Sequence, residues 1–112
     1  MDKPISQEDI CKKFGSLYSP PDADKRLGIA LSSLSLLPLN ALRHPAEHGT
    51  CGWYIWGGEF SYDDDFFQPL HVCHLVEHLP ALVPYLGLAP GWRVLLAPGH
   101  IDVWYDPMLL AV

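Results

Sequence analysis

Apolar residues recur along residues 69–86 with the spacing of an amphipathic helix. With successive residues placed about 100° apart, one face of such a helix carries Val72, Leu75, Val76, Leu79, Leu82, Val83 and Leu86. Pro80 and Pro84 interrupt this pattern, because a proline has no amide hydrogen and its ring clashes with the preceding turn. We therefore predict a kinked helix or two consecutive short helices, with Asp65 as the cap of a helix that starts near Phe66.

Two further helices are predicted nearer the N-terminus. Residues 6–14 begin with Ser6, a favourable N-cap, and carry acids early and lysines late, as the helix dipole favours. Asp22 can cap a second, amphipathic helix, because the residues that follow recur at spacings of three and four: Leu27, Ala30, Leu31 and Leu34.

Four segments have the composition of strands: residues 39–43, 51–58, 92–97 and 101–105. The second holds three large aromatic residues and an isoleucine, which is typical of a strand with neighbours on both sides. Pro98-Gly99-His100 separates the last two segments and indicates a β-hairpin. We predict an α+β fold, with an antiparallel sheet of about four strands and two or three helices packed on one face.

Size and composition favour one domain, residues 1–112. A chain of 112 residues that is 49% hydrophobic has material for one compact core. Three cysteines, odd in number and widely spaced, indicate reduced thiols. The N-terminal residues lack a signal-peptide hydrophobic region and no apolar run is long enough to span a bilayer, so we expect a cytoplasmic protein without a membrane partner.

The net charge of −6 lies entirely in the second half of the chain. Residues 1–58 carry six cations and six acids, whereas residues 59–112 carry one cation, Arg93, and seven acids. Nucleic-acid binding depends on Lys and Arg, so a nucleic-acid partner is not expected. A surface rich in acids and aromatic rings suits the capture of a basic protein.

Two groups of residues are candidates for this capture. The first, which we call the acidic lip, comprises Glu59, Tyr62, Asp63, Asp64 and Asp65. The second alternates along the last strand and would point to one face of the sheet: Asp102, Trp104 and Asp106. The plainer interpretations are a solvated loop for the aspartates and core packing for Trp104. Core packing is the favoured interpretation for Trp53, Trp56 and Trp92.

A ligand-binding or scaffolding domain would be favoured if the aromatic residues lined a closed pocket. The main alternative function is a small metal-dependent or thiol enzyme. His74 and His78 stand four residues apart, a spacing at which two imidazoles can share a metal, and His71 and Cys73 are close by. However, these side chains do not converge on one helix face. The hydrolase motif also requires a glutamate directly after the first histidine, and no glutamate follows His74. A third ligand would have to come from His44, His48 or His100. We therefore expect neither a metal nor another cofactor.

Cys51 is the remaining catalytic candidate. A catalytic thiolate usually lies at a helix N-terminus beside a histidine, whereas Cys51 begins an apparent strand. A small buried thiol is the preferred interpretation.

Two long segments resemble a family of small bacterial proteins described as immunity protein 33-like domains: GTCGWYIWGGEFSYDDDFFQPLHVCHL and LPALVPYLGLAPGWRVLLAPGHIDVWYDPMLL. The resemblance covers roughly residues 25–112 and rests on a Gly-Trp-Tyr-Ile-Trp strand, a Phe-Phe-x-Pro-Leu motif, a Pro-Gly-Trp-Arg turn and an Asp-Val-Trp-Tyr-Asp ending. Such proteins are similar to antidotes encoded beside polymorphic toxins that contact-dependent or type VI secretion systems deliver.

This resemblance implies a cytoplasmic, non-enzymatic protein that binds a cognate toxin domain and occludes its active site. It carries over no catalytic residues. From the charge of the second half we expect the toxin domain to be basic, for example a nuclease.

Overall fold

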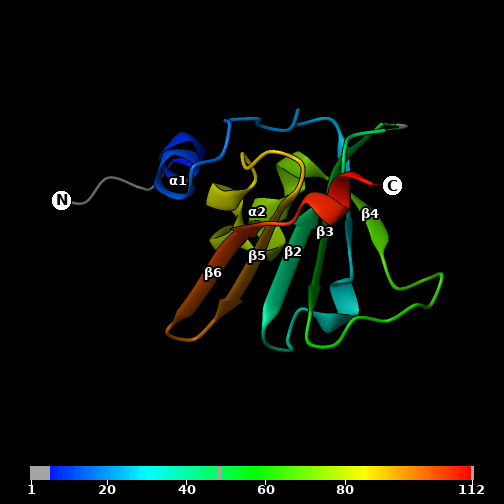
Figure 1. Ribbon diagram of the computed structural model, residues 1–112. Helices are drawn as coiled ribbons and strands as arrows, with labels where there is room; N and C mark the ends of the chain where they lie inside the picture. The colour runs from blue at the N-terminus through cyan, green and yellow to red at the C-terminus, as the bar shows by residue number, and fades with distance from the viewer. Residues whose placement is uncertain (1–5, 48, 112) are drawn as a thin grey trace.

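A six-stranded mixed sheet is the framework of the computed structural model, which describes residues 6–47 and 49–111 (Figure 1). In spatial order the strands are β4 (Gln68–His71), β1 (Arg26–Ile29), β3 (Thr50–Gly57), β2 (Leu39–Arg43), β5 (Trp92–Ala97) and β6 (His100–Tyr105). All neighbouring pairs are antiparallel except β1 and β3. The predicted α+β class is confirmed, and the predicted sheet of about four antiparallel strands is corrected to six strands with one parallel pair.

The predicted N-terminal helix is present as α1 (Gln7–Phe14). Its first turn is closed by a capping box, in which the Ser6 hydroxyl accepts from the Asp9 amide and the Asp9 carboxylate accepts from the Ser6 amide. Gly15, with φ of 86°, ends the helix. None of the helices in the described part of the chain has the length and apolar character needed to cross a bilayer.

The amphipathic helix predicted after Asp22 is wrong. Here the chain forms strand β1 and a short 3-10 helix, η1 (Leu31–Ser33). Leu27 and Ile29 point into the core from β1, and the strand is paired on both sides, with β3 and with β4. The apolar residues of this segment fit a strand-like alternation as well as they fit the helical spacing of three and four residues. Pairing with β3 and β4 selects the strand.

The helix predicted to start near Phe66 is also corrected. Asp65 caps no helix, since no helix follows it directly: residues 68–71 form β4, and the Gln68 side chain donates to the Asp65 carbonyl. Helical structure begins at η2 (Val72–His74), continues as α2 (Leu75–His78) and resumes at η3 (Pro80–Tyr85). The division into two short helices at Pro80 is confirmed.

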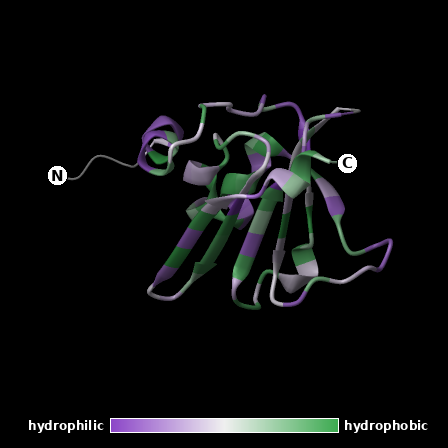
Figure 2. Cartoon of the chain, viewed as in Figure 1, coloured by the Kyte–Doolittle hydropathy of each residue, from purple (hydrophilic) through white to green (hydrophobic). Residues whose placement is uncertain are grey.

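The hydrophobic core lies between one face of the sheet and the helices. Ile10 of α1, Leu75 of α2 and Leu82 of η3 pack against Ile55 and Val94 of the strands. In Figure 1, α2 lies behind the sheet on this side. Figure 2 shows hydrophobic residues along the strands and hydrophilic residues on the outer side of α1 and on the loop between β3 and β4. Helices α1, α2 and η3 therefore cover one face of the sheet, as predicted.

A buried arginine joins the sheet to the segments that cover it. Arg43, 4% exposed, donates through Nε to the carbonyl of Cys51 and through NH1 to the carbonyls of Ser19 and Leu88 at 2.6 Å each. Its guanidinium lies 5.7 Å from the centre of the Trp53 ring. Burial lowers the pKa of Arg43. Among the described residues, carbonyl dipoles rather than a carboxylate stabilise this cation.

Candidate functional site

The face of the sheet opposite the helices, which we call the open face, carries the candidate site. Cross-strand partners point to the same face. One row of partners runs from Gly28 on β1 through Tyr54, Leu42 and Arg93 to Trp104 on β6. None of these five residues belongs to the buried core cluster. The row therefore marks the open face across five strands.

Aromatic side chains gather on the open face around β3 and the loop that follows it. Phe60 contacts Trp56, Phe66 and Phe67 at centroid distances of 5.3, 5.7 and 5.9 Å, and Tyr54 contacts Phe67 at 5.2 Å. Most of these contacts are edge-to-face, the arrangement that aromatic quadrupoles favour. We call Tyr54, Trp56, Phe60, Phe66 and Phe67 the aromatic cluster.

A groove of about 620 Å³ opens beside the aromatic cluster. Its wall is mostly apolar and comprises Leu42, His44, Pro45, Glu47, Thr50, Gly52, Tyr54, Trp56, Phe60 and Phe67. The lining includes one acid, Glu47, and one histidine, His44, and no lysine or arginine is among these described lining residues. We call this hollow the aromatic groove.

The acidic lip borders the aromatic cluster. Asp63, Asp64 and Asp65 surround a second hollow of about 500 Å³ together with Ser32 and Phe66. Tyr62 and the three aspartates are exposed, and the Tyr62 ring lies 5.0 Å from that of Phe60. The lip and the groove are thus neighbours through Phe60 and through the Phe66–Phe67 contact at 4.9 Å.

The other candidate group lies at the opposite edge of the sheet, because β6 and β4 are its outer strands. Asp102 and Trp104 lie on the open face, since they pair with Leu95 and Arg93. The Asp102 carboxylate lies 2.8 Å from His100 Nε2, and the Trp104 ring lies 5.4 Å from the Arg93 guanidinium. The two acidic groups therefore flank the open face and do not form one continuous patch.

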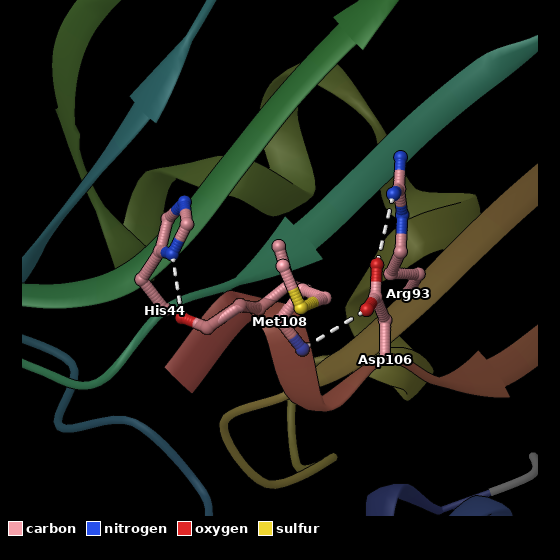
Figure 3. A network of polar contacts seen from close by, with 5 residues as sticks. His44, Arg93, Asp106 and Met108 are labelled. Atoms are coloured by element: carbon pink, nitrogen blue, oxygen red, sulfur yellow. Dashed lines mark hydrogen bonds and ion pairs between the residues drawn. The ribbon is translucent and has the colours of Figure 1, made fainter. Parts of the chain in front are cut away.

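Asp106 has a structural role. Its carboxylate accepts from Arg93 at 3.3 Å and from the Met108 amide at 3.1 Å, which starts the last 3-10 helix, η4 (Pro107–Leu110) (Figure 3). The Leu109 carbonyl is 2.9 Å from His44 Nδ1. Because a carbonyl only accepts, Nδ1 carries the hydrogen. These contacts hold η4 across one end of the open face, beside the aromatic groove.

The residues proposed for thiol or metal chemistry do not form a site. Cys51 is 2% exposed within the core, and burial raises the pKa of its thiol, which disfavours the thiolate. His71, His74 and His78 are exposed, and the first two rings are 5.9 Å apart. Within residues 6–47 and 49–111, no group of three or more His, Cys, Asp or Glu side chains is arranged to hold a metal ion.

The possible third metal ligands lie elsewhere. His44 is bonded to Leu109 and His100 to Asp102. His48 lies outside the described residues.

Sequence reasoning missed the aromatic groove. Trp53 packs in the core, as predicted, at 1% exposed; Trp56 is also buried, but on the other side of the sheet, under Phe60 and Phe67. The available signal was the alternation in β3, where Trp53 and Ile55 face the helices and Tyr54 and Trp56 face away.

Comparison with known proteins gives one family. The model of the Imm33-like domain matches residues 6–106, which is nearly the whole chain. No curated protein and no solved structure matches the chain significantly.

Proposed function

Because this chain belongs to the Imm33-like domain family, we propose that it is an immunity protein that binds a cognate toxin domain of a polymorphic or type VI effector and neutralises it. The action is stoichiometric: the bound protein occludes the active site of the toxin and performs no chemistry. In this proposal the chain acts as a single domain, in the cytoplasm, without a cofactor.

The observation that carries the proposal is the state of the acidic lip. The carboxylates of Glu59, Asp63, Asp64 and Asp65 are exposed and form no ion pair within the described part of the chain. Carboxylates left unpaired in this way produce a negative potential that attracts a basic protein and accelerates its association. A basic toxin domain is therefore the partner that we propose.

The proposed contact residues are those of the two acidic groups: Glu59, Tyr62, Asp63, Asp64, Asp65, Asp102, Trp104 and Asp106. The acidic lip contributes four exposed carboxylates beside the exposed rings of Phe60 and Tyr62. Trp104, 39% exposed, offers a further aromatic surface at the opposite edge. Asp106 pairs with Arg93, so it presents less negative charge to a basic partner than the carboxylates of the acidic lip do.

Co-expression tests the proposal. The chain is produced together with the toxin domain of its cognate effector, and growth of the host is measured. We expect growth to be restored, and the purified proteins to form a complex of one to one stoichiometry. A toxin that kills equally with and without the chain would contradict the proposed function.

A further inference from the structure

We infer that the aromatic groove receives a large apolar side chain of the toxin domain, carried on a basic segment that lies along the acidic lip. This inference rests on the proposed function for the identity of the partner. It adds which part of the surface anchors that partner. The groove, rather than the lip alone, then determines how tightly the complex is held.

The groove is already formed in the chain by itself. Tyr54, whose ring lies close against Gly28, forms its floor. Trp56 and Phe67, whose ring centroids are 6.1 Å apart, form its wall. A binding site that needs no rearrangement loses little of its interaction energy to ordering. An incoming side chain therefore meets a fixed apolar surface.

The size and lining of the groove suit an apolar anchor. Its volume of about 620 Å³ lies within the range of roughly 300–1,000 Å³ that is typical of ligand pockets. Phe60, 45% exposed, stands at its rim, so that apolar surface is open to solvent before a partner binds. Aromatic and apolar side chains that fill such pockets dominate the energetics of many interfaces.

The charge around the groove determines the character of the segment that carries the anchor. The acidic lip continues from Phe60, which stands at the rim of the groove. Since these acids repel phosphates and acidic peptides, the complementary segment is rich in lysine and arginine. The faces of the aromatic rings also attract such cations.

A peptide titration, monitored through the amide NMR signals of the intact chain, tests the inference. The probe is a short synthetic peptide with a central phenylalanine flanked by lysines and arginines. Matched peptides replace the phenylalanine by glycine, or the basic residues by glutamates. At up to about 1 mM, which detects a dissociation constant of that order, we expect shifts at Thr50, Gly52 and Tyr54 with the first peptide. Both matched peptides should produce clearly smaller shifts.

Two variants place a cation at the groove, Phe60→Lys at its exposed rim and Thr50→Lys in its lining. Leu17→Lys is the matched control, because Leu17 is 81% exposed and outside the groove. Each groove variant that keeps the native circular dichroism spectrum should lose at least about tenfold in affinity for the basic peptide. The control should bind as the wild type does.

Several results would overturn the inference: shifts confined to residues 59–65, equal shifts with the acidic peptide, or a self-associated chain whose groove excludes the peptide. The toxin assay separates this failure from that of the proposed function. If the chain neutralises the toxin and Phe60→Lys does so with unchanged affinity, the groove inference fails and the function stands. If the chain neutralises no toxin, the function fails whatever the peptides show.

Discussion

The ring of Tyr54 lies against the backbone of Gly28 on the parallel strand β1, so closely that a Cβ atom at position 28 would be 2.7 Å from Cδ1 of the ring. Real Cβ atoms do not approach other atoms to this distance. The absence of a side chain at Gly28 is therefore a condition for the position of Tyr54, and through it for the floor of the aromatic groove.

Gly28→Ala is expected to destabilise the protein by about 1–3 kcal/mol, the usual cost of overpacking. An alanine in a strand otherwise tends to stabilise, because it restricts the unfolded chain. Urea denaturation measures the free energy of unfolding. In a Tyr54→Ala background the same change should cost much less, since no ring remains to be displaced. Equal costs in both backgrounds would contradict the assignment.

Arg43→Met should destabilise the fold by at least about 2 kcal/mol. The variant leaves the buried carbonyls of Cys51 and Leu88 and the partly buried carbonyl of Ser19 without the arginine donor, and each buried unpaired group costs about 1–3 kcal/mol. Arg26→Met is the control, because Arg26 is exposed on β1. Chemical denaturation compares the two. Similar losses for both variants would mean that the buried contacts contribute little.

Stability should decrease as the pH rises above 9.0, the ordinary pKa of a cysteine thiol. Burial raises the pKa of Cys51 in the folded state, so above pH 9.0 the unfolded chain loses a proton that the folded chain keeps. Unfolding is favoured progressively up to the folded pKa. Denaturation curves between about pH 7 and pH 10 measure this slope. It should become shallower in Cys51→Ala, because that variant removes the buried thiol.

Replacing Asp63, Asp64 and Asp65 together by asparagine should slow association with the toxin domain roughly tenfold at low salt. The salt dependence of the rate should also weaken, because fewer charges attract the partner. Stopped-flow or surface-based kinetics provide the rates. The control removes three exposed acids elsewhere, as Asp22→Asn, Asp24→Asn and Glu77→Gln. If both triple variants behave alike, net charge alone is responsible and the acidic lip has no special role.

Asp106→Ala should reduce stability by about 1 kcal/mol, because Asp106 caps η4 and pairs with Arg93. Hydrogen exchange should increase at the amides of residues 108–110. Asp102→Ala is the comparison, since that carboxylate is 56% exposed and contacts only His100 among its described neighbours. A stability loss of the same size in Asp102→Ala would argue against the capping role.

The parts of the fold that the sequence predicts are those with strong local signals. Ser6 and Gly15 define α1, Pro98-Gly99 closes the β5–β6 hairpin, and the composition of residues 51–58 marks a central strand. Pro80 is a local break in a helical pattern and acts as one. Each of these features depends on neighbours in the sequence, so it can be identified without knowing the tertiary structure.

The errors concern segments whose structure depends on distant partners. Residues 26–29 become a strand because β3 and β4 supply hydrogen bonds on both sides, and residues 68–71 because β1 does. The aromatic groove was missed for the same reason: Phe60 and Phe67 follow β3 in a loop, and only the fold brings them beside Tyr54 and Leu42. The sequence identified the acids but not the hollow next to them.

The two edge strands of the sheet, β4 and β6, differ in their capacity to pair with a further strand. A proline cannot donate to a neighbouring strand, and Pro69 occupies the second position of β4. A further chain therefore cannot add a regular ladder there, while β6 presents six residues without a proline. Growth by edge-to-edge strand pairing needs an open edge strand on both sides of every sheet. Pro69 thus disfavours extension of the sheet by strand addition at β4.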